Sequence, residues 1–183
     1  MQARDLGWRR PRRSIVSIVD PVEKRLAHPF YLKMMGLNAV TNADALWDDL
    51  VAAGRGATED EVKRLLAPDH WRPVVMGSWF SLKFGRDQVG DSLIDAVGLC
   101  RGTLTAPSLT VAAATVIGED AVPTLVSYIE RDQERQYGAA PFVAAVVEHL
   151  GADTAVAPEN RDRTALARML EVADRLRSAW SPA

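Results

Sequence analysis

Few residues in this chain combine a reactive type with a spacing that chemistry requires. The histidines are His28, His70 and His149, and the only cysteine is Cys100. None of the histidines has a second histidine or cysteine at the spacing of a zinc site, and there is no nucleophile elbow or glycine-rich phosphate loop. A triad of residues far apart in sequence stays open, because its members need not be neighbours along the chain. The sequence therefore predicts no specific catalytic residue, metal ligand or cofactor.

Two aspartates form the clearest pair of candidate ligands. Asp91 and Asp95 are four residues apart in an expected helix, so their carboxylates share one edge of it. Such a pair can hold a cation or contact a basic partner. The residues around it do not supply further oxygen ligands in the order of a calcium loop. The interpretation that we favour is a solvated acidic edge.

The elements that position these residues follow from a phrase that recurs at a fixed period. Residues 84–87, 117–120 and 150–153 each read apolar-Gly-x-Asp, and their glycines are 33 residues apart. Each phrase follows an apolar stripe of helical period. Glycine can end a helix in the left-handed conformation, and aspartate can cap the next one. The period predicts a helical repeat array in which two helices pair around each of these corners.

One unit of this pattern resembles a known repeat. The segment from Val111 to Val126 is similar to a HEAT-type repeat, and the resemblance extends over roughly residues 70–152. The third unit departs from the pattern, because residues 154–160 do not read as a clean second helix. The resemblance implies an all-α fold, an α-α superhelix of HEAT-like helical hairpins that forms a short solenoid.

A wider resemblance covers most of the chain. Residues 28–34, 69–72 and 79–85 resemble family 6000 of the uncharacterised bacterial domains of unknown function. The shared motifs are structural in character. The resemblance implies a fold and no known reaction, so it supplies no catalytic residue.

Length and composition predict one domain with a tail. The chain has 183 residues, of which 48% are hydrophobic and 25% charged, which is ordinary for a globular domain. Residues 1–20, with four arginines around a proline at positions 9–13, are expected to be a flexible basic tail, and residues 21–183 a single helical-repeat domain. An arm that contacts phosphate or an acidic partner is the alternative for this tail.

Charge and cysteine content limit the location and the partners. The formal net charge of −2 argues against a dedicated nucleic-acid binder. The lone Cys100 suits a reducing cytoplasm, and no apolar run approaches the roughly 20 residues that span a bilayer. We expect a cytoplasmic protein that does not contact membranes.

The function that we expect is protein–protein interaction in a bacterial cytoplasm, of immunity or scaffold type. Curved helical arrays expose a concave wall formed by their second helices, and such walls bind other proteins. The side chain of Tyr128 is expected off the apolar stripe and partly exposed, as an interface anchor. The polar residues expected to contact the partner are Asp91, Asp95, Tyr128, Arg131, Arg163 and Arg168.

Two other functions stay open. A HEAT-like nucleic-acid-binding protein or DNA-base-repair enzyme would use aromatic rings and an acid, for which Trp71, Trp79 and Asp91 are the candidates. A small-molecule-binding helical protein would use a hollow beside the N-terminal segment, lined by Phe30, Tyr31 and Met34.

Local signals predict several helix ends. Thr58 and Glu61 have the spacing of a capping box, and Gly54 is expected to end the preceding helix, over residues 43–54. Pro68 and Asp69 are expected to separate two helices. Asn160 or Asp162 is expected to cap the last helix, which Trp180 closes.

Overall fold

The computed structural model of the chain describes residues 20–67 and 70–181, and all of its regular structure is helical. The all-α prediction is confirmed for these residues. The basic segment at positions 9–13, Pro68 and Asp69 lie outside the described residues. The elements in chain order are η1 (Glu23–Ala27), α1 (Tyr31–Met34), α2 (Asn38–Asn42), η2 (Asp44–Leu46), α3 (Trp47–Gly56), α4 (Glu59–Leu66), α5 (Trp71–Ser81), α6 (Arg86–Leu99), α7 (Ala106–Ile117), η3 (Gly118–Ala121), α8 (Val122–Arg135), α9 (Ala140–His149) and α10 (Asn160–Trp180).

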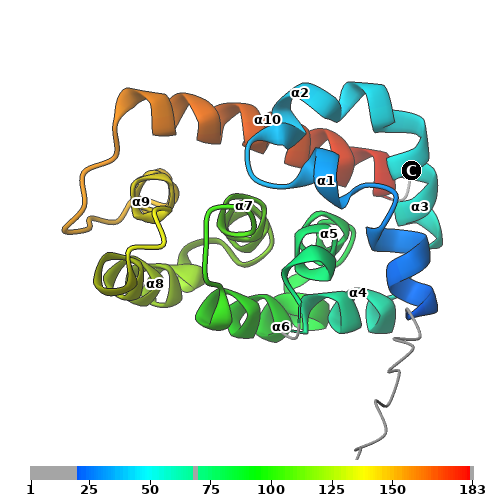
Figure 1. Cartoon of the computed structure of the whole chain (residues 1–183), viewed down its shortest axis with the longest axis horizontal. Coiled ribbons are helices and arrows are strands. Elements are labelled where there is room, and N and C mark those ends of the chain that lie inside the picture. The colour runs from blue at the N-terminus through cyan, green and yellow to red at the C-terminus, as the bar shows by residue number, and fades with distance from the viewer. Residues whose placement is uncertain (1–19, 68–69, 182–183) are drawn as a thin grey trace, which may run out of the picture.

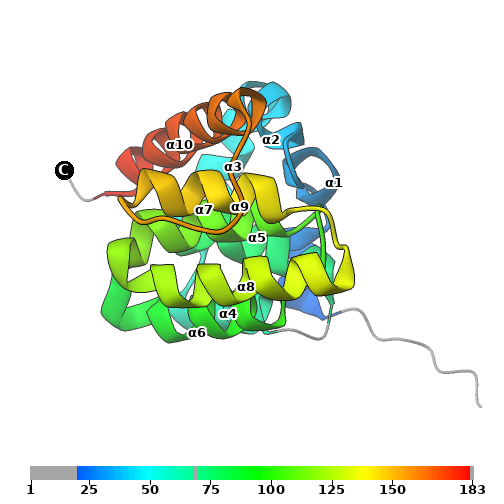
Figure 2. The same cartoon turned by 90° about the vertical axis from the view of Figure 1, so that its left-hand side faces the viewer.

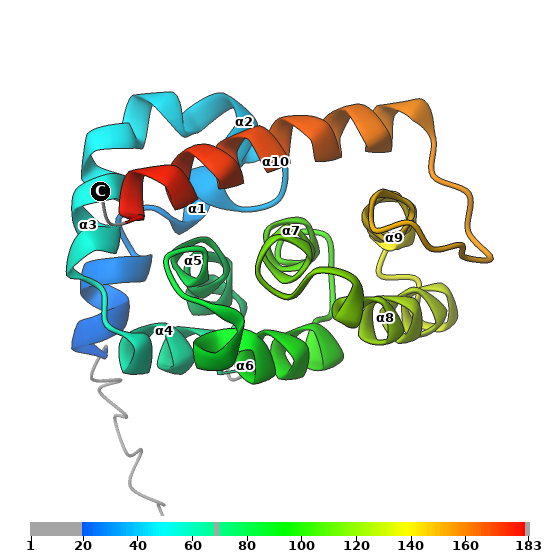
Figure 3. The same ribbon diagram turned by 180° about the vertical axis from the view of Figure 1, so that it is seen from behind.

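The helices lie in three layers. Figure 1 shows α5, α7 and α9 side by side and end-on, with α4, α6 and α8 beneath them. The long α10 crosses the opposite side of this middle layer, together with α1, α2 and α3 (Figures 1 and 3). The view from the side shows the same order, with α10 above α7 and α9, and α8 and α6 below them (Figure 2). The middle layer is therefore covered on both faces.

The middle helices can occupy this place because they are apolar on nearly every side. In α7 all residues from Ala106 to Ala114 are buried, and in α5 all residues from Pro73 to Ser81. A helix that is apolar all round is stable only when it is surrounded by other elements. The few hydroxyl groups inside the layer bond to carbonyl groups of their own helices, as when Ser78 Oγ donates to Val74 O at 2.7 Å.

The helices do not pair around the corners at Gly85 and Gly118, so that part of the sequence prediction is wrong, whereas around Gly151 α9 does pack against α10. The close consecutive pairs are α4 with α5, α6 with α7 and α8 with α9. By contrast, α7 and α8, on either side of Gly118, make hardly any contact with each other. The corners at Gly85 and Gly118 thus connect one helical pair to the next.

The three corner glycines do not share one conformation. Gly118 and Gly151 have φ angles of +72° and +79°, so both have the positive φ predicted for a glycine at a helix end, although a ψ of −143° places Gly118 outside the left-handed helical conformation itself. Gly85 has a φ of −79° and is the N-cap of α6, because α5 already ends at Ser81. Its amide donates to Gln88 Oε1 at 3.0 Å. The shared phrase therefore marks a turn at each position, but a helix stop with a positive φ at only two.

The other predicted helix ends differ in accuracy. The capping box of Thr58 and Glu61 is confirmed, since each side chain accepts a hydrogen bond from the other residue's amide. Gly54 does not end its helix, because α3 continues to Gly56. The N-cap of α10 is Glu159, whose amide donates to the Asp162 carboxylate at 3.0 Å.

One continuous helical stretch, Ala106–Arg135, has the length and apolar character of a membrane span, although half of its most apolar window is buried inside the fold. The stretch is interrupted by the 3₁₀ turn η3, where the chain changes direction into α8. These features are typical of core helices, which pass the same test of length and composition.

Candidate protein-binding groove

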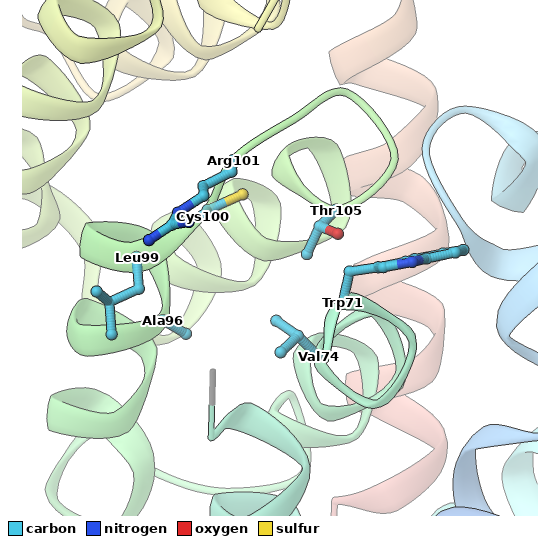
Figure 4. Close-up of a pocket in the computed structure, with 7 residues that line it drawn as sticks. All are labelled: Trp71, Val74, Ala96, Leu99, Cys100, Arg101 and Thr105. Atoms are coloured by element: carbon cyan, nitrogen blue, oxygen red, sulfur yellow. The ribbon is translucent and has the colours of Figure 1, made fainter. Parts of the chain in front are cut away.

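Two adjoining hollows open on the surface around Trp71, at the start of α5. Their volumes are about 400 and 510 Å³, and they share Trp71, Arg101 and Thr105 as a common wall. Figure 4 shows the first hollow, with Leu99 and Arg101 on one side of the opening and Trp71 and Val74 on the other. We call the two together the Trp71 groove. Its further lining residues are Ala96 and Cys100 in the first hollow and Gly102, Thr103, Leu104 and Tyr137 in the second.

The groove is formed where a loop crosses the end of a helix. The loop of residues 100–105 connects α6 to α7, and the Leu104 carbonyl accepts a hydrogen bond from the Gly36 amide at 2.9 Å. This bond ties the loop to the N-terminal layer. Two large apolar side chains are nevertheless left in solvent here, since Leu99 is 50% and Leu104 is 44% exposed. Exposed leucines that flank an open hollow are typical of a contact surface.

An aromatic and cationic stack forms the rim next to Trp71. The rings of Tyr31 and Trp71 meet edge to face with their centroids 5.7 Å apart. The guanidinium carbon of Arg72 lies 5.0 Å from the Trp71 ring centroid and 5.6 Å from that of Tyr31. Cation–π contacts hold such a guanidinium in place without neutralising its charge. The rim therefore presents a fixed positive charge beside an aromatic surface.

Behind the groove, a buried polar network connects α8 to its neighbours. Asp132 is 2% exposed, and its carboxylate accepts hydrogen bonds from the amides of Gly138, Ala139 and Ala140 at 3.0–3.2 Å. The Tyr128 hydroxyl donates to the same carboxylate at 3.2 Å. Asp132 thus satisfies free amides where α9 begins.

Burial also shapes the ionisation of two groups in this region. The pKa of the Tyr128 phenol is raised far above its ordinary value, first by burial and then by the neighbouring Cys100 and Asp132. Burial likewise raises the pKa of the Cys100 thiol. The thiol that lines the groove is therefore poorly suited to act as a nucleophile, which requires a thiolate.

The raised Tyr128 pKa predicts a loss of stability at alkaline pH. In the unfolded chain a tyrosine ionises near pH 10, whereas in the folded protein Tyr128 keeps its proton above that pH. The folded state then holds more protons, so the contribution of Tyr128 is complete below about pH 10 and decreases as pH rises, by at most ~1.4 kcal/mol per pH unit. We expect urea unfolding between about pH 9.5 and 11 to show a shallower pH dependence for Tyr128→Phe than for the native protein. Equal slopes would contradict this assignment.

The structure does not bring the six sequence-predicted contact residues together. Asp91 and Asp95 are exposed on α6, whereas Arg163 and Arg168 are exposed on α10, across the middle layer. Arg163 already forms a two-point ion pair with Glu148, at 2.8 Å for each bond. Arg168 lies in a shallow hollow between α2 and α10.

The remaining two predicted residues, Tyr128 and Arg131, lie on α8 and have structural contacts. Tyr128 is fully buried, so the expectation of a partly exposed ring is wrong. Arg131 Nη2 donates to Val97 O at 3.1 Å, near the end of α6, and its guanidinium carbon lies 5.5 Å from the Tyr128 ring centroid. These contacts fix α8 against α6.

Half of the residues named for the two alternative functions are core residues. Phe30 and Met34 are buried, and the Met34 carbonyl accepts a hydrogen bond from Trp79 Nε1 at 3.0 Å. The indole of Trp79 is therefore fixed in the core, while Asp91 is exposed on another helix. Among the described residues, no group of three or more histidine, cysteine, aspartate or glutamate side chains is placed to hold a metal ion.

Sequence reasoning did not find the groove, although one signal was available. The turn between α6 and α7 reads as polar, yet it is bordered by Leu99 and Leu104, which belong to no helical stripe. Trp71 was named as a candidate aromatic residue of a base-repair site, and its ring is half-buried against Tyr31. Large apolar residues that fit no stripe are candidates for a contact surface.

Comparisons with known proteins do not assign the chain to a family. No family model matches it, and neither a curated protein nor a solved structure is significantly similar to it.

Proposed function

We propose that this chain is a protein-interaction module that binds a segment of another protein in the Trp71 groove. The observation that carries the proposal is the pair of adjoining open hollows between two half-exposed leucines, Leu99 and Leu104. Tryptophan, tyrosine and arginine are enriched among the residues that dominate binding energy at protein interfaces. All three residue types occur at this groove, as Trp71, Tyr137 and Arg101.

In this proposal the scaffold is a short array of HEAT-like helical pairs. The three consecutive pairs of α4 to α9 stack side by side, which supports such an array. Helix α10 covers the middle layer, so the binding surface is placed at the ends of the helices instead of along a concave wall. The unpaired and buried Cys100 supports a reducing location such as the bacterial cytoplasm. A scaffold or immunity role fits a module of this kind.

The indole of Trp71 is expected to be a main anchor of the bound partner. The variant Trp71→Ala removes the largest of the three side chains that line both hollows. We expect the dissociation constant of a groove ligand to rise at least about tenfold, as for a central interface tryptophan. The ligands are to be selected from a displayed library of random peptides on the immobilised native protein, and their affinities measured by fluorescence anisotropy.

The matched control is Trp47→Ala. Trp47 is also half-buried, but it lies on α3 beneath the Arg175 guanidinium, whose central carbon is 4.4 Å from its ring centroid. The control should leave ligand affinity unchanged, and urea unfolding should confirm that both variants are folded. A library that yields no ligand, or ligands that bind Trp71→Ala as tightly as the native protein, would refute the proposed function.

A further inference from the structure

The charge of the Trp71 groove is opposite in sign to that of the whole chain. The chain has a formal net charge of −2, yet the described residues that line the two hollows include Arg101 and no carboxylate. Arg72 adds a second positive charge at the rim, on the stack with Tyr31 and Trp71. Resting on the proposed function, we infer that the groove takes an extended segment of a partner protein in which a carboxylate lies between two large apolar side chains.

The position of Arg101 sets the order of these groups. Arg101, Trp71 and Thr105 line both hollows, so they form the wall between them. Beyond this wall the first hollow continues over Val74 and Leu99, and the second over Leu104 and Tyr137 (Figure 4 shows the first hollow). An occupant that crosses the wall places one apolar side chain in each hollow and its middle residue next to Arg101.

The geometry of an extended chain fits this arrangement. In a strand, residues i, i+2 and i+4 point to the same side, about 6–7 Å apart from one to the next. Hollows of about 400 and 510 Å³ are each large enough for a leucine or aromatic side chain. The pattern that we derive for the partner is therefore apolar-x-acidic-x-apolar.

The electrostatics favour a carboxylate at the middle position. Within the described residues, Arg101 is in none of the ion pairs, unlike Arg86, which pairs with Asp120, or Arg163, which pairs with Glu148. A guanidinium and a carboxylate form two parallel charge-assisted hydrogen bonds. A lysine in the same place would put two cations together on an apolar floor, which selects against basic segments.

A nucleic acid fits the same surface less well. Arg101 is the only cation among the described residues that line the two hollows, whereas a nucleic acid needs several cations along its phosphate backbone. The apolar residues on both sides of Arg101 also offer no partner to phosphates. We therefore assign the groove to an acidic and apolar peptide segment.

The test uses three labelled synthetic peptides that differ at one position. Their centres read Leu-Ala-Asp-Ala-Leu, Leu-Ala-Asn-Ala-Leu and Leu-Ala-Lys-Ala-Leu, with identical polar flanks, and binding to the full chain is measured by fluorescence anisotropy. We expect the aspartate peptide to bind about tenfold more tightly than the asparagine peptide, and the lysine peptide to bind most weakly. In Arg101→Glu the order of the aspartate and lysine peptides should be reversed. The matched control is Arg168→Glu, which changes an exposed arginine on α10 that is also in none of the ion pairs among the described residues, and it should keep the native order.

The outcomes separate this inference from the proposed function. If library-selected ligands depend on Trp71 but carry basic residues, or if the asparagine and aspartate peptides bind equally, the inference is wrong and the proposed function stands. Binding of labelled duplex or single-stranded DNA that is lost in Arg101→Glu would also overturn the inference. If none of the peptides and no library ligand depends on Trp71, the proposed function itself is wrong.

Discussion

Replacing Asp132 with alanine is expected to lower the free energy of unfolding by about 3–4 kcal/mol. The buried Asp132 carboxylate accepts hydrogen bonds from three amides and from the Tyr128 hydroxyl. Its removal leaves these donors without a protein partner, at about 1–3 kcal/mol for each donor that water cannot reach. Loss of a helix cap by itself costs about 0.5–2 kcal/mol. Urea unfolding followed by circular dichroism measures the difference.

The controls distinguish this network from ordinary surface charge. Asp95→Ala removes an exposed aspartate from α6 and should change stability by no more than about 0.5 kcal/mol. Asp132→Asn keeps the shape but replaces one acceptor oxygen by a donor, so an intermediate loss is expected. An Asp132→Ala variant as stable as Asp95→Ala would show that the turn between α8 and α9 does not depend on this carboxylate.

The second large effect is expected at the C-terminal end of α10. Replacement of Trp180 by alanine should cost about 3–5 kcal/mol, as for other large buried aromatics. The indole is 8% exposed, its Nε1 donates to Val51 O at 3.1 Å, and its ring packs at 5.9 Å from the Phe80 ring. These contacts fasten the last helix to α3 and to the middle layer. Chemical unfolding of the purified variant measures the loss.

A double-mutant cycle with Gly54 checks the cause of this effect. A Cβ atom at Gly54 would lie 2.2 Å from Trp180 Cζ2, so Gly54→Ala should destabilise the native protein. In the Trp180→Ala background that clash is gone, and the same change should stabilise α3 by up to about 1 kcal/mol, because alanine is the better helix former. If Gly54→Ala has the same sign in both backgrounds, the close packing of α3 on Trp180 is not the cause.

The contacts of Asp132 and Trp180 fix the helices around the Trp71 groove. Asp132 and Tyr128 hold α8 and the start of α9 behind the loop of residues 100–105, while Trp180 fastens the layer that contains α3. The Trp71 groove lies where the ends of α5, α6 and α8 meet this loop. A rigid scaffold of this kind positions an exposed loop for binding.

Features that depend only on local contacts could be predicted from the amino-acid sequence. Helical periodicity predicted the all-helical structure of the described residues, the spacing of Thr58 and Glu61 predicted their capping box, and Gly118 and Gly151 have the positive φ predicted for a glycine at a helix end. Each of these outcomes rests on the dihedral preferences or hydrogen bonds of residues within one helical turn. Neighbours along the chain are sufficient to fix them.

The tertiary structure alone decided which helices pair and which side chains remain exposed. The helices α5, α7 and α9 are apolar on nearly every side. Their periodicity therefore indicates a helix, but it does not show which face packs against which neighbouring helix. In the sequence, Asp132 lies in a run of charged residues and would be placed in solvent. In the fold, the turn after α8 brings three backbone amides to its carboxylate, so Asp132 is buried. The Tyr128 hydroxyl donates to the same carboxylate, and its ring is buried as well. The groove around Trp71 depends likewise on elements from separate parts of the chain, and only their packing determines which apolar residues stay in solvent.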